Sequence, residues 1–575
     1  MPKTDYSQRD KESLIAEIVA LKKRKKYGLM WEDKPEEVVT RCQSELPVLQ
    51  EVKGLSIDSA PGLPTNLLIE GDNYHALSVL NYTHAGKIDV IYIDPPYNTG
   101  NNGWKYNDQC VDVNDGYRHS KWISMMNNRL RLAKNLLTQH GIVFVSIDDI
   151  EQARLKLLMD DIFGNENFVT CIARVTKAGG NKGELYKPKK DYVLFYANNK
   201  TSIKKSDYGL LVKKQHDWLA EYFNGEQREY ILGDTPYRAG LEVRPNQRYY
   251  MKAPDGSLLI PPGNVFPKKK ADAEQVKPQN EDDKCWSWSR DRYVEERKLD
   301  KVVFKKTTRS PFLDAEGKRS KWTVKKKLLK SDVEGRRDIL SDYIKEFPNS
   351  HGTAELKKLG IPFGYPKPTG LIKHLIERAC KSDSVILDFF AGSGTTGHAV
   401  AALNKEDGGN RRYILCTNNE NGIARKICQP RIKAVIKGHE KLPDITGIPS
   451  NLRYYETSFV DAAPTDPNKI ELTKRATEML CVREHTFDGV KSHADYRIFR
   501  NQNRYTGIIY DPEAIPQFKR AVAAVDGKFK VYVFSLGGDD FAEEFADLGG
   551  KVTVSSIPES ILRAYRKIFK TDTGK

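Results

Sequence analysis

We expect this chain to fold as an α/β protein with a doubly wound, mainly parallel sheet, an inserted domain and a small α/β domain at its end. The run "KIDVIYID" (residues 87–94) is apolar almost throughout, as is typical of a strand covered on both faces. Helix-like stretches separate such runs at the spacing that a mainly parallel sheet requires. The pattern stops after about residue 175 and resumes after residue 365. At 575 residues the chain is also too long for one core.

The first part of the chain predicts a helical arm followed by alternating strands and helices. Apolar residues from Leu14 to Leu21 share one side of an amphipathic helix over 10–28, and a connecting arm follows to about residue 65. Strands are then expected at 67–73, 87–94 and 141–149, and helices at 122–137 and 151–164.

The alternation returns in the second part. Helices are expected at 369–380, 391–405 and 424–438, and strands at 384–390 and 411–420. The stretch 443–467 is rich in proline and predicts a linker. A last unit has strands at 529–536 and 551–557 and a closing helix at 559–570. The expected parts are an N-terminal helical arm (1–55), a first α/β half (56–174), an insert (175–355), a second α/β half (356–445), and a linker with a C-terminal α/β domain (446–575).

Composition favours a polyanionic partner. Lys and Arg number 93 against 77 Asp and Glu, which gives a formal net charge of +16. A mildly basic enzyme without a nucleic-acid role is the alternative. The eight cysteines are scattered, without the spacing of a zinc site or the density of a disulfide scaffold, so we expect a cytoplasmic protein and no metal. The sequence has no long apolar run and no signal-peptide core, so we expect no membrane span.

The insert is basic and rich in turn residues. Its charge runs at 266–270, 304–309 and 318–327 alternate with aromatic residues, and Trp286, Trp288 and Trp322 belong to it. A loop-rich domain with a solvated surface has this composition, and so does a reader of nucleic acid. The insert alone leaves both interpretations open.

The motif "DFFAGSGTT" begins at Asp388, where an expected strand ends. Gly392 and Gly394 permit a tight turn into a helix and a close approach of the backbone to a ligand. Nucleotide-like cofactors bind at the carboxyl ends of such strands. A dehydrogenase turn or simple tight packing are alternatives. The next strand ends near Glu420. Glu420 could accept hydrogen bonds from the hydroxyl groups of a ribose, and an exposed acid at a strand end is the alternative interpretation.

The motif "DPPY" follows the strand 87–94. Two prolines can simply end a strand, because proline cannot donate to a sheet ladder. The functional interpretation uses all four residues. Pro95 and Pro96 hold the backbone rigid, Asp94 and the Pro95 carbonyl supply acceptors, and Tyr97 supplies a flat face. Acceptors beside a ring suit a planar base with an exocyclic amine that has left its helix.

Taken together, the two motifs resemble those of the S-adenosylmethionine-dependent amino-methyltransferases of DNA. "DPPY" precedes "FAGSG" across a long insert, as in the permuted β group, which has a Rossmann-like fold with a target-recognition region between the two halves. The segments "GDNYHALSVL", "IYIDPPYNTG", "HSKWISMMNNRLRLAKNLL" and "DIFGNENF" resemble the modification subunits of type III restriction systems. The resemblance covers about 67–170 and 360–440. Trp104 departs from it, because the family commonly has phenylalanine there.

The resemblance implies a site-specific adenine-N6 methyltransferase that uses S-adenosylmethionine and acts on double-stranded DNA. Asp94 and Pro95 would accept hydrogen bonds from the target amine, Pro96 would stiffen the turn, and Tyr97 would stack on the flipped base. Asp72 would contact the adenine end of the cofactor and Glu420 its ribose. The cofactor residues that it implies are Asp72, Asp94, Lys367, Pro368, Asp388, Phe389, Phe390, Ala391, Gly392, Ser393, Gly394, Thr395 and Glu420.

Several alternatives stay open at this point. In this family an aspartate at the first motif position favours adenine N6, whereas serine favours cytosine N4, so cytosine N4 is the first alternative. Methylation of a ring carbon needs a thiolate that attacks the ring. Enzymes of that class carry this cysteine after a proline, and none of the cysteines here follows one. A nicotinamide-dependent oxidoreductase would explain the glycine turn but not "DPPY". A DNA-binding relic, or a recognition subunit for a nuclease, is the non-enzymatic alternative. By position, the C-terminal domain suits homodimerisation, docking to a restriction subunit or an extension of the DNA contact.

Overall fold

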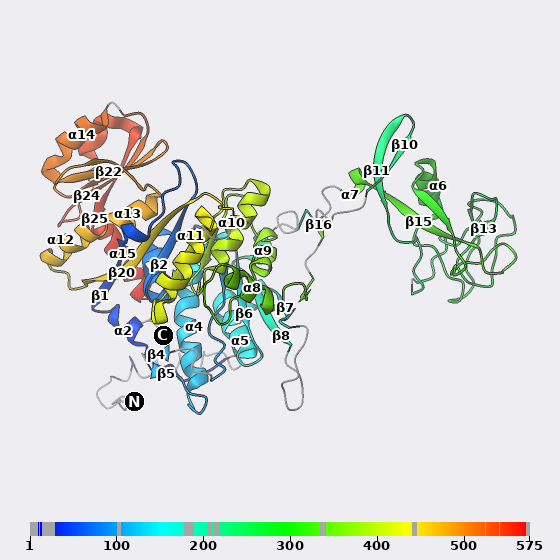
Figure 1. The fold of residues 1–575 in the computed structure, drawn as a ribbon, viewed down its shortest axis with the longest axis horizontal. Helices are drawn as coiled ribbons and strands as arrows, with labels where there is room; N and C mark the ends of the chain where they lie inside the picture. The colour runs from blue at the N-terminus through cyan, green and yellow to red at the C-terminus, as the bar shows by residue number, and fades with distance from the viewer. Residues whose placement is uncertain are drawn as a thin grey trace. The chain divides into compact units, whose positions relative to one another are not determined.

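The structure, a computed structural model, describes residues 10, 12–13, 29–100, 105–107, 109–177, 189–203, 210–211, 218–240, 242–333, 337–338, 341–439, 446–523, 525–539 and 541–570. The helix expected over 10–28 lies almost entirely outside these residues, and Trp104 lies outside them too. The chain forms two compact units, one of residues 1–208 with 340–575 and one of residues 209–339 (Figure 1).

A ten-stranded sheet forms the centre of the first unit, in the order β1-β20-β2-β19-β18-β3-β6-β8-β7-β17. Every neighbouring pair from β20 to β6 is parallel, while β1 and β8 run antiparallel to their neighbours. The predicted doubly wound, mainly parallel sheet is therefore confirmed. Its strands are β1 (Glu45–Glu51), β2 (Thr65–Glu70), β3 (Ile88–Ile93), β6 (Leu137–Ile147), β7 (Phe168–Val175), β8 (Lys190–Ala197), β17 (Tyr343–Ile344), β18 (Val385–Asp388), β19 (Arg412–Thr417) and β20 (Asn451–Asp461).

Helices cover both faces of this sheet. In β3, Ile91 and Ile93 pack into one hydrophobic cluster while Val90 and Tyr92 pack into the other, because successive side chains point to opposite faces. Both faces of the strand are buried, so its side chains are apolar at consecutive positions. The first cluster includes residues of α3 (Asn73–Thr83), α4 (Arg118–Leu136) and α5 (Gln152–Phe163), and the second includes residues of α9 (Thr369–Glu377), α10 (Thr395–Asp407) and α11 (Gln429–Lys437).

Two segments predicted as connections are strands, so those predictions are wrong. β1 lies in the expected N-terminal arm, and β20 lies in the stretch 443–467 that was expected to be a linker. The two strands pair antiparallel from Glu45↔Asp461 to Glu51↔Tyr455. The prolines around β20 flank the strand and do not interrupt it. Pro47 is tolerated inside β1 because β1 is the edge strand of the sheet.

The chain after β20 forms the expected small α/β part, which belongs to the same compact unit as the large sheet. Its five strands are ordered β21-β22-β23-β24-β25, with the last three parallel. Both α13 and α15 pack on α3, and the Arg483 guanidinium donates to the Tyr82 carbonyl at 3.0 Å. These elements are α12 (Asp466–Arg475), α13 (Thr477–Glu484), β21 (Asp488–Ser492), β22 (Tyr496–Asn501), β23 (Arg504–Ile509), α14 (Ile515–Ala523), β24 (Lys528–Phe534), β25 (Val552–Ile557) and α15 (Glu559–Lys570).

The second unit is narrower than the predicted insert of 175–355, because β7, β8 and β17 belong to the large sheet. It holds a four-stranded antiparallel sheet of β10 (Leu219–Phe223), β11 (Glu226–Leu232), β15 (Trp322–Leu329) and β14 (Val302–Lys306), with helix α6 (Arg290–Lys298). Trp286, Trp288 and Trp322 are all buried. They pack inside this small unit, so the aromatic residues among its charge runs include core residues.

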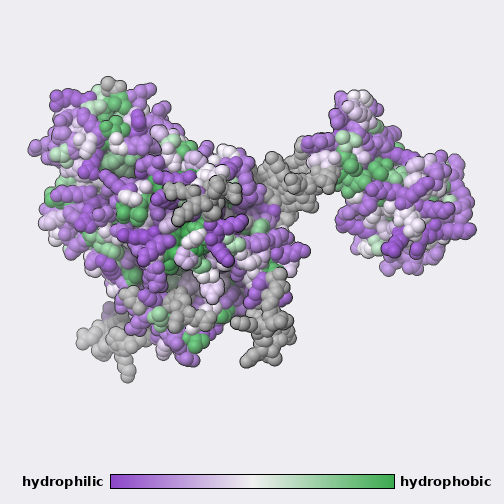
Figure 2. All heavy atoms as spheres, viewed as in Figure 1, coloured by the Kyte–Doolittle hydropathy of each residue, from purple (hydrophilic) through white to green (hydrophobic). Residues whose placement is uncertain are grey.

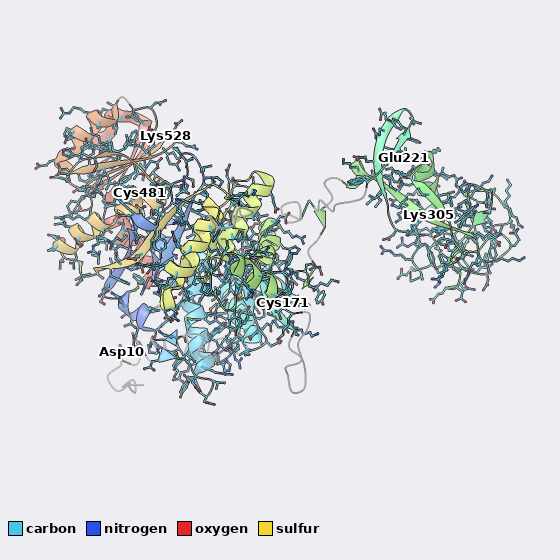
Figure 3. The ribbon with its side chains drawn as sticks, in the orientation of Figure 1. Asp10, Cys171, Glu221, Lys305, Cys481 and Lys528 are labelled. Atoms are coloured by element: carbon cyan, nitrogen blue, oxygen red, sulfur yellow. The ribbon has the colours of Figure 1, made fainter. Side chains whose placement is uncertain are left out.

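The surface of each unit is largely hydrophilic on the face seen in Figure 2. Lys305, at the exposed end of β14, belongs to the surface of the second unit (Figure 3). Among the described residues, no helix combines the length and the apolar character needed to span a membrane.

We predict that a chain ending at Gly447 loses its cooperative thermal unfolding transition or melts well below the full-length chain. Such a chain lacks β20, so β1 loses its partner, β2 loses one neighbour, and α3 loses the cover of α13 and α15. Circular dichroism melting of both chains tests this. An unchanged melting temperature would show that the C-terminal part is independent of the sheet.

Candidate active site

The two sequence motifs meet at the carboxyl edge of the large sheet. β18 pairs with β3 in parallel, Ile386 opposite Val90 and Leu387 opposite Ile91. Asp94 follows the last residue of β3, and Asp388 is the last residue of β18. Parallel strands present their carboxyl ends at one edge, so the two motifs, far apart in the sequence, form one corner of the molecule.

Lys367 connects the two halves of this corner. Its ammonium lies 2.6 Å and 2.7 Å from the two carboxylate oxygens of Asp94 and 2.8 Å from the Tyr97 hydroxyl. The Lys367 side chain is 11% exposed and that of Asp94 is 24% exposed. Pro368 follows as the N-cap of α9. The structure thus brings together Asp94, Tyr97 and Lys367, which the sequence analysis assigned to one site.

A buried ion pair lies behind Tyr97. Arg174 on β7 binds both carboxylate oxygens of Asp191 on β8, at 2.7 Å and 2.5 Å, and the Tyr97 hydroxyl lies 3.5 Å from Asp191. Burial raises the pKa of the Tyr97 hydroxyl well above its ordinary value, and the charges of Asp94 and Asp191 raise it further. Tyr97 is therefore a neutral ring whose hydroxyl is held between a cation and an anion. Nothing in the local sequence around residues 174 and 191 singles out this pair.

The backbone of "DPPY" is fixed by side chains from other elements. The Trp122 indole on α4 donates to the Pro96 carbonyl at 2.7 Å. Asn98 adopts a left-handed conformation with φ of 57°, and its amide donates to the fully buried Glu151 at 2.6 Å. The prolines and these two anchors together make a rigid turn. Trp122 and Glu151 were missed at the sequence level because both contacts join distant segments.

The glycine turn has the backbone that its sequence requires. Gly392 and Gly394 have φ of 49° and 79°, a region that residues with a side chain rarely adopt. A Cβ on Gly394 would lie 3.0 Å from Cys428 Sγ, whereas one on Gly392 would meet nothing closer than 3.8 Å. Gly394 is thus needed for packing, whereas a Cβ on Gly392 would make only ordinary van der Waals contacts. Helix α10 begins directly after the turn, and no side chain caps its N-terminus.

The carboxyl group of Asp388 faces inward and stabilises this turn. Its oxygens accept from the Thr396 hydroxyl at 2.5 Å and from the Phe390 backbone N–H at 3.0 Å. Burial raises its pKa to about 7, more than those hydrogen bonds lower it. Its side chain is thus used within the chain, and a direct cofactor contact by this carboxylate remains a prediction.

Arg431, which the sequence analysis did not select, joins the turn to two helices. From α11 it donates to Ser393 at 3.1 Å, to Thr395 at 2.7 Å and to Thr369 at 2.9 Å, and it pairs with Glu355 of α8 (Asn349–Lys358) at 3.3 Å. The side chains of Ser393 and Thr395 therefore point into the protein and leave their backbone for a ligand. A sequence signal exists, because Arg431 falls on the apolar face of α11 beside Ile432 and Val435.

The remaining predicted cofactor residues divide into buried and accessible positions. The Phe389 ring is fully buried in the core, Ala391 is buried, and Phe390 is half-buried. A lining role for Phe389 is therefore restricted to its backbone, whose carbonyl accepts from the Asn73 amide at 3.0 Å.

Asp72 and Glu420 lie after β2 and β19, at the same edge of the sheet. Asp72 caps α3 by accepting from the Tyr74 backbone N–H at 2.7 Å, and it pairs with buried Arg129 at 3.1 Å. Glu420 is exposed and lies 3.7 Å from the Lys105 ammonium. Their roles toward a cofactor stay predictions.

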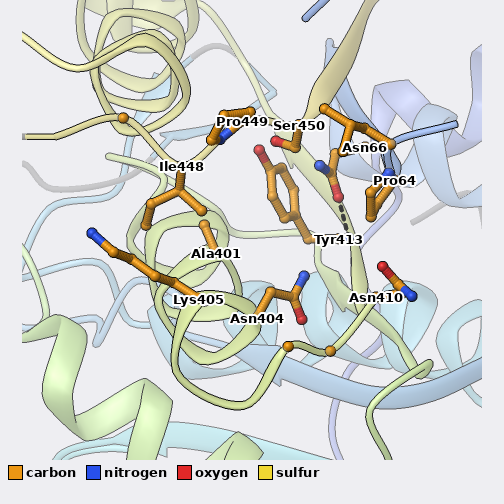
Figure 4. Close-up of a pocket in the computed structure, with 14 residues that line it drawn as sticks. Pro64, Asn66, Ala401, Asn404, Lys405, Asn410, Tyr413, Ile448, Pro449 and Ser450 are labelled. Carbon is orange, nitrogen blue, oxygen red and sulfur yellow. Dashed lines mark hydrogen bonds between the residues drawn. The ribbon is translucent and has the colours of Figure 1, made fainter. Parts of the chain in front are cut away.

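A separate pocket lies at the opposite edge of the sheet. It is lined by residues that include Asn66 and Tyr413, which stand near the amino ends of β2 and β19, with Asn404 and Lys405 of α10 (Figure 4). The Tyr413 backbone N–H donates to the Asn66 side chain at 2.9 Å. This pocket holds none of the predicted site residues.

Comparison with known proteins gives a family and several relatives. A family described as DNA methylase, of N6 and N4 methyltransferases, matches residues 88–427, a range that contains both motifs and the second unit. The type II methyltransferase M.KpnI of Klebsiella pneumoniae is 32% identical over 435 residues, which is 72% of this chain and 92% of that protein.

Two modification subunits of type III restriction enzymes are similar as well. The EcoPI Mod subunit of Escherichia phage P1 is 29% identical across 71% of this chain and 66% of that subunit. The StyLTI Mod subunit of Salmonella typhimurium (strain LT2) is 32% identical across 63% of this chain and 54% of that subunit. The matches thus cover just under two thirds of the length of the EcoPI Mod subunit and about half of the length of the StyLTI Mod subunit.

This chain belongs to the DNA methylase family. Its match includes the paired strand ends, the "DPPY" turn and the glycine turn. The resemblance to type III modification subunits is confirmed by relatives that carry that name. Family membership leaves no support for the nicotinamide-dependent alternative.

We predict that Arg431→Met lowers the free energy of unfolding by about 3 kcal/mol, because it leaves Glu355, two hydroxyls of the turn and the Thr369 hydroxyl of α9 without their cation. Urea unfolding measures the change. Lys433→Met is the control, since Lys433 is exposed on the same helix. Equal effects of the two substitutions would contradict a special role of Arg431.

We predict that the stability of the protein falls between about pH 4 and pH 7 through Asp388. Its folded pKa of about 7 exceeds the ordinary value of about 3.8 for an aspartate, so the folded state holds the proton more tightly. The stabilisation from the protonated carboxyl is fully present below the unfolded pKa of about 3.8 and is lost as pH rises through the folded pKa of about 7. The free energy of unfolding therefore falls by up to about 4 kcal/mol over this range. Melting temperatures across this range should fall less steeply in Asp388→Asn. Asp383→Asn, at an exposed position, should melt like the parent chain, and parallel profiles for all three would contradict the prediction.

Proposed function

We propose that this chain is a site-specific DNA methyltransferase that transfers the methyl group of S-adenosylmethionine to N6 of an adenine flipped out of the duplex. The observation that carries the proposal is the joining of the "DPPY" turn to the glycine turn by the pairing of β3 with β18. Acceptors at Asp94 and a neutral ring at Tyr97 match a planar base with an exocyclic amine.

The residues at the sheet edge fit the proposed cofactor. An amino-acid group with an ammonium and a carboxylate needs an anion and a cation close together, and Asp94 and Lys367 provide them. The left-handed glycine at 392 and the N-terminus of α10, which no described side chain caps, suit a close backbone approach. When bound, S-adenosylmethionine would supply a methyl group already activated on a sulfonium.

The chain's own residues orient and activate the target amine. The Asp94 carboxylate and the Pro95 carbonyl accept its N–H bonds, which increases electron density on the nitrogen and directs its lone pair away from both acceptors. The rigid prolines, with Trp122 on the Pro96 carbonyl, keep these acceptors from relaxing. Tyr97 stays neutral because its pKa is raised, so its ring can stack on the base without a buried charge.

The second unit is proposed to read the DNA sequence. It lies between the two motifs in the chain, and its basic strands carry exposed side chains such as Lys305 and Lys306. Lysines on an exposed sheet suit contacts with phosphates. Because type III Mod subunits are among the relatives, association with a restriction subunit is also proposed, as is homodimer formation.

We predict that Asp94→Ala lowers the rate of methyl transfer at least 100-fold, roughly the effect of losing one preorganised polar contact in an active site. DNA binding should persist, because the second unit is unchanged. The assay measures label moved from tritiated S-adenosylmethionine to plasmid DNA, and sequencing of modified bases identifies the base and the recognition site.

Asp149→Asn is the matched control, since Asp149 is an exposed carboxylate just past the end of β6, at the same edge. Full activity in Asp94→Ala would refute the role of the carboxylate. Label found as N4-methylcytosine would favour the alternative base, and no label on any DNA would refute the proposed function.

A further inference from the structure

We propose that Lys367 is an internal competitor of the target amine, which opens the base site when the carboxylate of the cofactor's amino-acid group attracts its ammonium. In the position seen, Lys367 fills the acceptors on which the target amine would sit. A base would thus be held productively only after cofactor has bound. This inference rests on the proposed function and deepens it.

The three N–H donors of the Lys367 ammonium all point to oxygens of the proposed base site. An ammonium has three N–H donors, and three oxygens lie within 2.8 Å of this one: both carboxylate oxygens of Asp94 and the Tyr97 hydroxyl. The ammonium also lies 4.8 Å from the centre of the Tyr97 ring. Lys367 and a target amine therefore compete for the same acceptors.

A neutral amine is a weak competitor for this position. Hydrogen bonds between charged groups are about twice as strong as those between neutral groups. Removing Lys367 from Asp94 without another anion would also leave a largely buried cation unpaired, which is costly. Displacement of Lys367 thus requires a new negative charge.

Among the described residues, the carboxylates next to this site do not supply that charge. Asp191, next to Tyr97, has both oxygens engaged by Arg174. Asp388, whose charge would act on Asp94, has its oxygens engaged by Thr396 and Phe390 and a pKa raised to about 7. The charge must therefore come from a ligand, and the proposed cofactor carries a carboxylate.

Lys367 can move its side chain while its backbone stays fixed. A Cβ on Gly352 of α8 would lie 2.6 Å from the Pro366 carbonyl oxygen and 2.8 Å from that of Lys367, so α8 packs directly on this segment. Thr369, two residues on, is tied through Arg431 to Ser393 and Thr395 of the glycine turn. A four-carbon side chain on this anchor can change its torsion angles between Asp94 and a carboxylate near the turn.

The first test measures binding of S-adenosylhomocysteine and of its decarboxylated analogue by calorimetry. The parent chain should bind S-adenosylhomocysteine at least tenfold more tightly than the analogue, and Lys367→Met should lose that preference. Lys373→Met is the control, because Lys373 lies on α9 and pairs with Glu406 at the surface. A preference that persists unchanged in Lys367→Met would overturn the carboxylate contact. If Lys367→Met melts early, Lys367→Gln replaces it.

The second test measures base flipping with 2-aminopurine in place of the target adenine, in the site found by sequencing of modified bases. In the parent chain and in Lys373→Met, fluorescence should rise several-fold only when S-adenosylhomocysteine is added. In Lys367→Met it should rise without it. Flipping by the parent chain without S-adenosylhomocysteine, or flipping in Lys367→Met that still requires it, would overturn the proposal.

Methyl transfer by the parent chain is measured in parallel to separate the two conclusions. A parent chain that labels DNA while the two tests fail refutes the role of Lys367 alone. A parent chain that labels no DNA refutes the proposed function itself.

Discussion

The parallel pairing of β18 with β3 is the contact on which the site depends. Asp94 and the glycine turn are separated in the chain by the whole second unit, yet two backbone registers, Ile386 with Val90 and Leu387 with Ile91, bring them to one corner. Because both strands are buried on both faces, a slip of register would misplace apolar side chains on each side. The core therefore fixes where the two strands end, and this sets the positions of the "DPPY" turn and the glycine turn.

Buried arginines then fix the loops that leave this core. Arg431 binds the glycine turn to α8 and α9, Arg174 holds Asp191 behind Tyr97, and Arg129 holds Asp72 at the start of α3. Each is almost completely buried and joins segments that are distant in the sequence. Planar guanidinium groups suit this task, since one side chain can satisfy several oxygens in fixed directions. A corner assembled in this way keeps its shape while a single flexible side chain, Lys367, remains to respond to a ligand.

The sequence predicts most of this fold because its signals are local. The apolar runs of β3 and β18, the prolines at 95 and 96, and the glycines at 392 and 394 can be recognised from neighbouring residues. The contacts of Trp122 with Pro96 and of Arg431 with Ser393 could not, because they depend on tertiary packing. Local signals also misled. Prolines around β20 suggested a linker where the structure has a strand.

The place of β20 has a consequence for how the protein is made. β2 lies between β20 and β19, so Ile69 has Tyr455 on one side and Cys416 on the other. During synthesis on the ribosome, both edges of β2 therefore stay unpaired until β19 and β20 have been synthesised. Such long-range parallel pairing slows folding and leaves exposed edges prone to association.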